Sequence, residues 1–510
     1  MADAPKNPVP AVETDQASVR LDKLRQLESL GIDPWGQRFD GRTPIGEIRL
    51  LEPLPFDDAN PQGPRVTAAG RIVRHRTGGK LHFLELWDQS GRIQLMIRVN
   101  KVSELEWKVL NLLDLGDIIG VSGEFGKTKV GELTIQVDQL TFLTKSLEPH
   151  PKDVFGLGDM EYRLRHRYLD MIYTPETLKR IQQRVKIVRT IRNHLDDQGY
   201  VEVETPTLHA IAGGAAARPF ATHHNALGLD LFVRIALELP LKRLLVGGLE
   251  KVYEIGRVFR NEGISPRHNP EFTMLELYCA YGDLFSIMEL TEGVFGACVE
   301  GLGLGTTLPY GKRQIDFTGP WPRVLYSDIF KRTVGVDLFD EAGVRTAATA
   351  NHLHLELRDT KAGTSTPKQH EVLVHELFEH LCEPELAKGH QPTFVYDYPA
   401  ALCPLTKRKR ENPKLAERFE LYIAGMELAN AYTELNDPIM QEATFREQLA
   451  GMNADDSMAK MDDDFVRALR HGMPPAGGLG IGIDRLVMLL TNTTSIRDVI
   501  LFPLLRPEAH

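Results

Sequence analysis

The 510-residue chain is 42% apolar and 25% charged, so it is long enough for two or three domains with real cores and is neither fibrous nor disordered as a whole. Its formal net charge of -10 means that a nucleic-acid ligand has to be held by local basic patches and not by the overall field. The polar N-terminus lacks the apolar core of a signal peptide, no run of about 18 apolar residues occurs, and the four cysteines are far apart, which together predict a cytoplasmic protein.

The N-terminal region is predicted to hold a tail and then a helix. Residues 1–16 are rich in proline and polar residues, which predicts a disordered tail. Leucines from Leu21 to Leu30 then recur at helical spacing, and Gly31 ends that helix. We therefore expect residues 17–64 to form a helical extension that packs on the domain after it.

Residues 65–144 carry five strand-like runs separated by turns, with a helical stretch before the fourth run. This order is typical of an OB-fold β-barrel, which binds single-stranded nucleic acid on its open face. The spacing alone also fits other small barrels. We predict an OB-fold domain over this range.

A second domain is expected after a linker. Residues 145–176 are charged and interrupted by prolines, as is typical of a linker. Apolar residues from Leu178 to Leu195 follow at helical spacing up to Gly199, and a strand-like run comes next. On its residues alone this is a core helix face, and we predict that the domain spans residues 177–510.

One carboxylate lies inside an otherwise apolar run, at Glu238. A buried carboxylate is costly unless it is paired, so a positively charged partner is implied. Lys242 or Arg243 nearby could be a purely structural partner. Upstream, Gly214 allows the backbone to approach a ligand closely.

The densest concentration of charge lies in residues 256–278, in a loop between two strand-like segments. Within it, the arginines could clamp a polyphosphate. The charged residues of this loop are Arg260, Glu262, Arg267 and His268.

The strand after this loop has an unusual face. Alternation places Phe272, Met274, Glu276 and Tyr278 on one side, so that a carboxylate lies between aromatic side chains. The phenyl ring could carry a planar base and the carboxylate could meet a cation. On residue chemistry alone, an ordinary exposed hairpin is the alternative.

Three further carboxylates lie in a strand-like stretch, at Glu420, Glu427 and Glu434. The first two have opposite parity, so a turn or bulge near Gly425 is needed to bring them to one site. Closely placed carboxylates repel unless a cation lies between them, and Mg²⁺ is the natural candidate beside a nucleotide. A surface salt-bridge cluster remains the alternative.

The last informative stretch, residues 476–492, is a glycine-rich strand that leads into an apolar helix at Arg485. Its G-x-G-x-G spacing is not the G-x-G-x-x-G of a dinucleotide loop, and no βαβ unit surrounds it. The preceding region, residues 300–415, shows several histidines without a convincing metal spacing.

Taken with their order, these stretches resemble the motifs of class II aminoacyl-tRNA synthetases, and most closely the bacterial lysyl-tRNA synthetases of subclass b. The resemblance implies an α+β protein, with an N-terminal OB-fold barrel and a catalytic domain built on an antiparallel sheet flanked by helices. The matching segments are motif 1 at about 178–206 (a homodimer interface), motif 2 at 256–278, an insertion at about 300–415, motif 3 at 476–492 and the anticodon-binding domain at 65–144.

The resemblance implies a lysine–tRNA ligase, which forms lysyl-adenylate and pyrophosphate from L-lysine and ATP and then transfers lysine to the 3′ end of tRNA(Lys). It implies a homodimer and Mg²⁺ bound with ATP. Two other readings stay open at this point: an enzyme of the same fold that lysylates a protein, and a non-catalytic RNA-binding paralogue. The former relatives typically lack an OB domain, and the latter should have lost motif residues that are present here.

Residue roles follow by matching to the family motifs. The implied ATP-binding residues are Arg260, which is also the catalytic residue on the α-phosphate, Glu262, Arg267, His268, and the base-sandwiching pair Phe272 and Arg485. The implied lysine-binding residues are Gly214, Glu238, Arg260, Glu276, Tyr278, Asn430, Tyr432 and Glu434. The implied Mg²⁺ ligands are Glu420 and Glu427, and the implied anticodon-binding residues are Phe83, Gln94 and Glu132.

Three positions near the site depart from the family pattern. Leu237 stands where a proline is common, Pro240 where an aromatic is common, and Ala401 where an acidic residue is expected. We expect effects on affinity, but none of these departures removes a residue assigned above.

Overall fold

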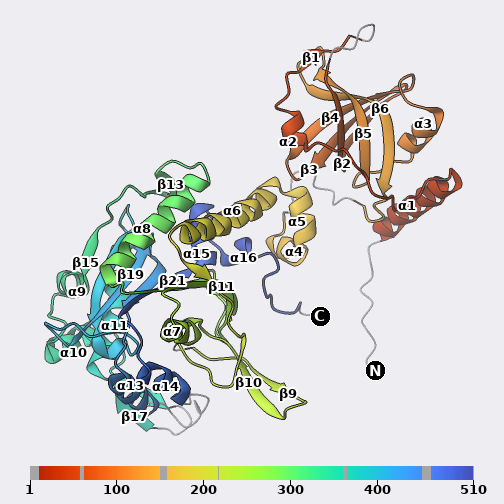
Figure 1. The fold of residues 1–510 in the computed structure, drawn as a ribbon. Coiled ribbons are helices and arrows are strands. Elements are labelled where there is room, and N and C mark those ends of the chain that lie inside the picture. Colours follow the sequence, from red (N-terminus) through yellow and green to blue (C-terminus); the bar gives the residue numbers. More distant parts are fainter. Residues whose placement is uncertain are drawn as a thin grey trace. The chain divides into compact units, whose positions relative to one another are not determined.

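The structure is a computed structural model that describes residues 11–57, 63–149, 158–215, 217–359, 364–450 and 461–508. The chain divides into two compact units, Met1–Gly158 and Asp159–His510, which are described one at a time (Figure 1).

The first unit is a closed five-stranded β-barrel, which confirms the predicted OB fold. The strands neighbour one another in the order β5-β2-β3-β4-β6, and β5 also pairs with β6, so the barrel has no open edge. A helix, α3 (Glu104–Asn111), precedes the fourth of these strands, and a Ser103–Glu106 capping box starts it. The strands are β2 (Arg65–Gly78), β3 (Leu81–Asp88), β4 (Gly91–Arg98), β5 (Ile118–Lys127) and β6 (Leu133–Thr144).

The prediction of a disordered tail over residues 1–16 is wrong for residues 11–16, which are helical. Helix α1 (Ala11–Ser29) begins directly after Pro10, and no proline or glycine follows within it to break the helix. Residues 1–10 lie outside the described residues. Leu27 on this helix is fully buried in the barrel core, but beyond α1 the expected helical extension contains only α2 (Ile45–Ile48) and the short strand β1 (Leu54–Pro55).

The linker expected over residues 145–176 is partly replaced by helices. Residues 150–157 lie outside the described residues, but α4 (Met160–Arg165) and α5 (Arg167–Tyr173) follow at once. The charges there are not all solvated: Arg167 and Asp170 are buried and 2.7 Å apart, and Arg167 also donates to three backbone carbonyls near the C-terminus. Pairing therefore lets a charged segment belong to the core of the second unit.

The second unit is organised around an eight-stranded sheet with the order β15-β18-β19-β20-β21-β12-β11-β7. Its central pairings are antiparallel, as expected, while the edge pairs β7–β11 and β15–β18 are parallel, which makes the sheet mixed. The α+β class is confirmed. The strands are β7 (Val201–Glu202), β11 (Lys251–Phe259), β12 (Glu271–Ala280), β15 (Arg323–Leu325), β18 (Thr393–Pro399), β19 (Leu415–Ile423), β20 (Met426–Thr433) and β21 (Ala476–Gly482).

Three helices supply the largest core, together with the sheet. They are α6 (Pro175–Asp197), α8 (Leu284–Gly301) and α15 (Ile483–Leu490), and α8 lies along the sheet in Figure 1. On α6, Ile187 and Ile191 face this core, whereas Val185 of the predicted apolar stripe is 54% exposed. The helix therefore has a second apolar face that the described chain leaves in solvent.

The segment expected to be an insertion, residues 300–415, builds its own small core around Tyr326, Phe330 and Phe378. Two of its strands, β15 and β18, nevertheless join the central sheet. The helices of this segment are α9 (Tyr326–Val334), α10 (Glu341–Ala350), α11 (His370–Leu377), a π-helical turn at Phe378–Cys382, α12 (Glu383–Leu386) and a 3-10 turn at Ala400–Leu402.

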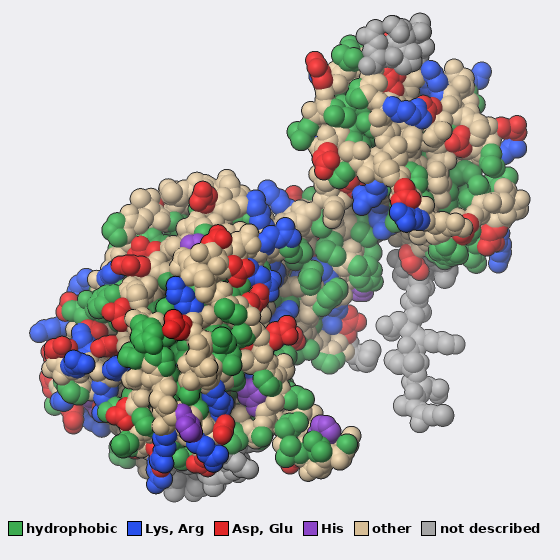
Figure 2. Space-filling view, in the orientation of Figure 1, with side chains coloured by type: hydrophobic (Ala, Val, Ile, Leu, Met, Phe, Trp, Pro, Cys, Tyr) green, Lys and Arg blue, Asp and Glu red, His purple; other side chains and the backbone are tan. Residues whose placement is uncertain are grey.

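The remaining elements of the second unit lie outside the central sheet. Figure 2 shows acidic and basic side chains interspersed over the visible face, and a lobe at the position of β9–β10, where Leu227 and Leu229 are exposed. None of the described helices is both long and apolar enough to cross a membrane. These elements are α7 (Glu238–Val246), β8 (Leu208–His209), β9 (Ala221–His224), β10 (Leu229–Val233), β13 (Thr307–Tyr310), β14 (Arg313–Asp316), β16 (Glu356–Asp359), β17 (Thr364–Pro367), α13 (Pro438–Ala450), α14 (Asp463–Arg470) and α16 (Ile496–Val499).

Candidate active site

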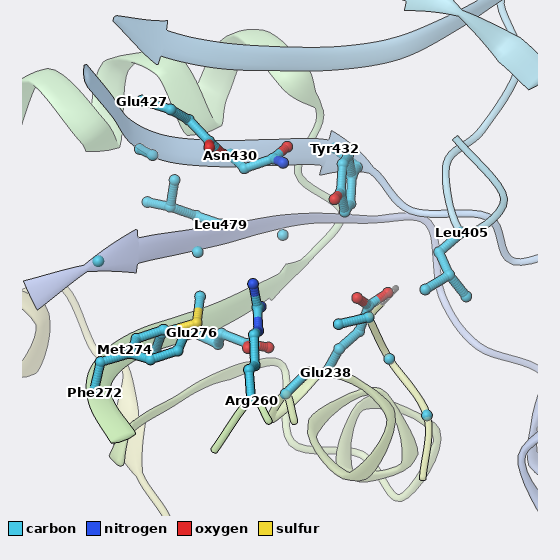
Figure 3. A pocket seen from close by; sticks show the side chains of 18 of the residues that line it. Glu238, Arg260, Phe272, Met274, Glu276, Leu405, Glu427, Asn430, Tyr432 and Leu479 are labelled. Atoms are coloured by element: carbon cyan, nitrogen blue, oxygen red, sulfur yellow. The ribbon is translucent and has the colours of Figure 1, made fainter. Parts of the chain in front are cut away.

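A cavity of about 670 Å³ opens over strands β12, β21 and β20, and side chains from distant parts of the sequence reach it from opposite walls (Figure 3). Figure 3 shows Asn430 and Tyr432 on one side of the space, and Arg260 and Glu238 on the other. The predicted residues that line it are Gly214, Glu238, Arg260, Glu262, Arg267, His268, Phe272, Glu276, Tyr278, Glu427, Asn430, Tyr432, Glu434 and Arg485.

Strand register explains why these residues meet. Gly480 of β21 lies between Glu276 on β12 and Asn430 on β20. Gly478 lies in the same way between Tyr278 and Tyr432. Because β21 offers no side chain at these positions, the rows on either side of it enclose an open space.

The glycine at position 478 is sterically required. A Cβ atom added there would lie 2.0 Å from Oε1 of Glu434 and 2.6 Å from the ring of Tyr278. Gly214, on the opposite wall, has a φ of 85°, which favours glycine, and an added Cβ there would lie 3.2 Å from the Cβ of Ala236. The glycine-rich motifs therefore give the cavity its shape.

Two buried carboxylates face one end of the cavity. Glu276 accepts a hydrogen bond from the backbone N–H of Leu237 at 3.0 Å and one from the Tyr278 hydroxyl at 3.3 Å, and burial raises the pKa of Glu276 to about 7. Glu434 is completely buried, and burial raises its pKa to about 8. No other described group hydrogen bonds to Oε1 of Glu434, so this oxygen can still accept a donor.

The positively charged partner expected for Glu238 is Lys242, whose Nζ lies 2.6 Å from Oε1 of Glu238. The same ammonium group also pairs with Glu434, and Lys242 is fully buried. Arg243, the other candidate, instead contacts Asp462 at 2.7 Å. A structural partner is therefore present within the cavity wall itself.

The charged loop of residues 256–278 folds back over the other end of the cavity. The guanidinium carbon of Arg260 lies 5.2 Å from the ring centroid of Phe272. Arg485 donates to the backbone carbonyl of Glu427 at 2.8 Å, and its Nη2 lies 3.0 Å from Nε2 of His268. Partial burial and the neighbouring Arg485 lower the pKa of His268, so this ring is neutral near pH 7.

The two carboxylates expected to bind a cation, Glu420 and Glu427, lie on the β19–β20 hairpin. The predicted irregularity is present, since the register shifts between Leu421 and Tyr422 and Gly425 has a φ of 76°. Enclosure and the nearby carboxylate of Glu420 raise the pKa of Glu427, so the two groups repel.

The two carboxylates differ in how readily they could bind a divalent cation. Glu427 is half-buried and lines the cavity, whereas Glu420 does not line it. Glu420 already accepts hydrogen bonds from the hydroxyls of Tyr398 at 2.8 Å and Tyr422 at 2.6 Å, and it pairs with Arg418. A carboxylate has about four acceptor positions, so about one remains on Glu420, and the oxygen chemistry of the pair suits Mg²⁺.

Arg418 is a site residue that the sequence analysis missed. It lines the cavity, its Nε donates to Oδ1 of Asn430 at 3.1 Å, and its guanidinium lies over the rings of Tyr398 and Tyr432 at 4.8 and 5.7 Å. The sequence could have indicated it, because Arg418 is two residues before Glu420 and so lies on the same strand face. It links the residue expected to bind lysine to the residue expected to bind the cation.

Asp484 is a second missed residue, with a positioning role. Its Oδ1 lies 2.5 Å from Nη1 of Arg184 on α6, and its Oδ2 accepts from the backbone N–H of Thr273 at 2.7 Å. Arg184 also donates to the Thr273 hydroxyl at 3.1 Å. Asp484 thus ties together helix α15, strand β12 and helix α6, directly beside Arg485.

The three residues expected to read an anticodon lie on the barrel. Phe83 on β3 is opposite Met96, and Gln94 on β4 is opposite Glu85, so Phe83 and Gln94 are diagonal neighbours on one half-exposed face. Gln94 donates to the hydroxyl of Thr134 at 3.0 Å, and that hydroxyl donates to the backbone carbonyl of Glu132 at 3.1 Å. The structure therefore brings all three to the same part of the barrel.

The departures from the family pattern have local explanations. Leu237 supplies the N–H that Glu276 accepts, which a proline could not do. Pro240 lies in the first turn of α7, where backbone N–H groups have no partner within the helix. Ala401 lines the cavity but is exposed, and the structure gives no reason for its identity.

A sheet of this topology, whose glycine-rich strand lies between an arginine-bearing hairpin and a carboxylate-bearing one, defines a class II aminoacyl-tRNA synthetase catalytic domain. The chain belongs to the family described as tRNA synthetases class II (D, K and N), whose model matches residues 159–506. The model described as OB-fold nucleic acid binding domain matches residues 66–143.

Similar proteins cover almost the whole chain, and those compared are named lysine–tRNA ligase. The protein from Moorella thermoacetica is 51% identical over 498 residues, 97% of this chain and 99% of that protein. The protein from Bacillus subtilis is 49% identical over 495 residues, 96% of this chain and 97% of that protein. The protein from Thermoanaerobacter sp. is 49% identical over 493 residues, 96% of each chain.

Proposed function

We propose that this protein is a lysine–tRNA ligase, which activates L-lysine with ATP and then transfers lysine to the 3′ end of tRNA(Lys). The observation that carries the proposal is the pair of buried carboxylates, Glu276 and Glu434, with the hydroxyl of Tyr278 beside them. A buried carboxylate wall favours a substrate side chain that ends in an ammonium group. An aspartate or asparagine pocket would need a cation or neutral donors at that end.

The backbone of lysine is held by the opposite wall. Glu238 and the backbone at Gly214 take the α-ammonium group, and Arg260 with Asn430 takes the α-carboxylate. Arg418 keeps the Asn430 amide oriented through the hydrogen bond to its oxygen. The side chain of lysine then extends past Tyr432 toward Glu276 and Glu434.

ATP occupies the other end of the cavity. Its base lies between the ring of Phe272 and the guanidinium of Arg485, and Glu262, Arg267 and His268 of the loop contact the nucleotide. Arg485 is held in place for this role by Glu427 and His268. Bound Mg²⁺, held by Glu427 and Glu420, would neutralise charge on the phosphates.

No protein nucleophile is needed. The carboxylate of lysine attacks the α-phosphorus of ATP, the bond to the β-phosphate breaks, and pyrophosphate leaves while Arg260 stabilises the charge on the α-phosphoryl oxygens. A ribose hydroxyl at the 3′ end of tRNA then attacks the carbonyl of lysyl-adenylate, and AMP leaves. The tight walls align the two reacting groups.

The tRNA is bound in part by the barrel, whose face carries Phe83, Gln94 and Glu132. An aromatic ring beside amide and carboxylate groups on an OB-fold face suits an unstacked base. The protein acts in the cytoplasm, where tRNA charging takes place.

We further propose a homodimer that uses the second apolar face of α6. On this face Val185 is exposed, and Leu178 and Ile181 are only half-buried. Burying it against a second copy would remove apolar surface from water. Light scattering should give the molar mass of a dimer for the natural protein and a lower molar mass for Val185→Asp. A monomeric mass for the natural protein would refute this assembly.

The first test is ATP–pyrophosphate exchange with each standard amino acid. We expect exchange with lysine alone, and a loss of roughly 10²-fold in kcat/KM for lysine in Glu276→Gln. Glu271→Gln is the matched control, because Glu271 is exposed on the same strand and does not line the cavity. Exchange with aspartate or asparagine would overturn the substrate, and no exchange with any amino acid would favour an RNA-binding paralogue.

A further inference from the structure

Lys242 is a buried charged residue beside the lysine-binding wall to which the proposed function assigns no task. It is fully buried, its Nζ lies 2.6 Å from Glu238, and it forms an ion pair with Glu434. These two carboxylates come from different elements, α7 and the segment after β20. The ammonium of Lys242 is therefore the bridge between the part of the wall that meets the α-ammonium group of the substrate and the part that meets its side chain.

The charges of this wall match the substrate only when Lys242 is counted. Three carboxylates face the lysine end of the cavity, at Glu238, Glu276 and Glu434. When all three are ionised, Lys242 cancels one of them, which leaves two negative charges for the two ammonium groups of lysine, while Arg260 pairs with the α-carboxylate. Without Lys242, one buried carboxylate would have no counter-charge, and such a group is strongly disfavoured.

Steric contacts give the bridge a fixed length. Glu434 cannot retreat freely because its Oε1 already lies over Gly478, at the point where any Cβ would clash. Glu238 is anchored in the first turn of α7, four residues before Lys242. The Lys242 ammonium also lies 6.0 Å from the ring centroid of Tyr278.

We propose that Lys242 is a positioning residue for lysine, which sets both the spacing of Glu238 and Glu434 and the number of negative charges that the substrate meets. This inference rests on the lysine-activating function proposed above. It assigns Lys242 to the recognition of the substrate and not to the stability of α7 alone.

The test is the variant Lys242→Met, which keeps an unbranched side chain of similar length and removes the charge. In pyrophosphate exchange near pH 7, the KM for lysine should rise by roughly tenfold or more, because Glu238 and Glu434 lose their spacing and one of them binds a proton. The KM for ATP should change by less than about threefold, since the ATP end of the cavity is untouched.

The pH profile separates this role from a merely structural one. Lysine must displace the extra proton in Lys242→Met, so log KM for lysine should fall more steeply with rising pH, by up to about one proton per lysine. The other groups that face this proton are Glu276 and Tyr278 from β12, Tyr432 and Glu434 from β20 and the segment after it, Glu238 from α7, and Arg260 from the loop after β11. These are the same in both proteins, so the difference in slope reports the loss of Lys242.

A matched control exists in the other unit. Lys145 is also fully buried between two carboxylates, Asp114 and Asp117, at 2.7 and 2.9 Å. Lys145→Met should leave the KM for lysine in pyrophosphate exchange unchanged, because this assay uses no tRNA. A folded Lys242→Met protein with the natural KM for lysine and the natural pH slope would overturn the proposal.

A second pair of variants tests the role of Lys242 if Lys242→Met does not fold. Glu238→Gln leaves one negative charge in the wall, and Glu238→Gln/Lys242→Met leaves two without an internal cation. The double variant should show the steeper pH slope for lysine, and equal slopes would refute the role. Should the natural protein fail to exchange with lysine at all, the proposed function itself is wrong, which is distinguishable from both results.

Discussion

Each unit of this protein buries a lysine between two carboxylates, yet the two clusters differ in how completely they are satisfied. In the barrel, Lys145 pairs with Asp114 and Asp117, the backbone N–H groups of Ser146 and Asp114 both donate to Asp117, and Lys23 adds a second ammonium to Asp114. Burial alone would raise the pKa of Asp114, but the two lysines hold it below its ordinary value. This cluster is closed.

The cluster around Lys242 is open. Oε1 of Glu434 has no hydrogen bond from any described residue, and the pKa values of Glu434 and Glu276 are raised by burial, to about 8 and about 7. A lysine between two carboxylates thus stabilises the fold in one unit, whereas in the other unit the carboxylates can still pair with a further cation. Incomplete pairing, and not burial of charge as such, distinguishes the proposed lysine site.

The largest expected effect breaks the closed cluster. Lys145→Met leaves two buried aspartates without their shared ammonium, so we expect the free energy of unfolding of the barrel to fall by about 3–5 kcal/mol. Chemical denaturation of the full chain, followed by tryptophan fluorescence, measures it. A stability unchanged from the natural protein would show that the closed cluster contributes nothing.

A variant in the open site should show the opposite pattern. Among the described residues, the side chain of Arg260 makes one hydrogen bond, of 3.4 Å to the carbonyl of Ile235, and lies over Phe272, so Arg260→Ala should hardly alter stability. It should nevertheless lower pyrophosphate exchange by roughly 10²-fold or more, because the charge on the α-phosphate loses its partner. Exchange at the natural rate would remove Arg260 from the reaction.

The two clusters should respond to pH in opposite directions. Because the pKa values of Glu434 and Glu276 are raised from 4.5, the ligand-free protein binds more protons than the unfolded chain, and stability falls as the pH rises through about 5 to 8. The lowered pKa of Asp114 contributes stability that is lost only in acid. Melting temperatures from about pH 5.5 to 8.5, with and without lysine, test this: lysine should stabilise most at the alkaline end.

The smallest expected effect concerns one backbone N–H. Leu237→Pro removes the hydrogen bond to Glu276, which should raise the pKa of Glu276 further and increase the KM for lysine at neutral pH by about tenfold or less. Leu237→Met is the control, since it keeps the N–H and most of the side-chain volume. Equal KM values for the two variants would show that the hydrogen bond does not matter.

Much of this site could be predicted from strand parity. Alternation alone placed Phe272, Glu276 and Tyr278 on one face, and the opposite parity of Glu420 and Glu427 required the irregularity that is found near Gly425. Such inferences work because they depend only on the chain within one strand or hairpin. The five barrel strands and the helix before the fourth were predictable along the chain for the same reason, whereas their pairing was not.

Contacts between side chains on different helices and strands were harder to predict from the sequence. Whether Glu238 pairs with Lys242 or with Arg243 follows from helix geometry, but the second contact of Lys242, to Glu434, depends on how α7 packs beside the sheet. The buried pair of Arg167 and Asp170 was interpreted as part of a charged linker for a similar reason. A charge looks solvated in sequence until its partner's position in space is known.

The glycines of β21 that face the cavity limit how its size can be changed by substitution. At Gly478 and Gly480 there is no side chain left to trim, and an added methyl group would meet Glu434 at one position and Met274 at the other. Substitutions at these two positions can therefore only shrink the cavity. A version that accepts bulkier lysine analogues can gain volume from the flanking strands, at Met274, Tyr278 or Tyr432, where each change also alters the wall proposed to select the substrate.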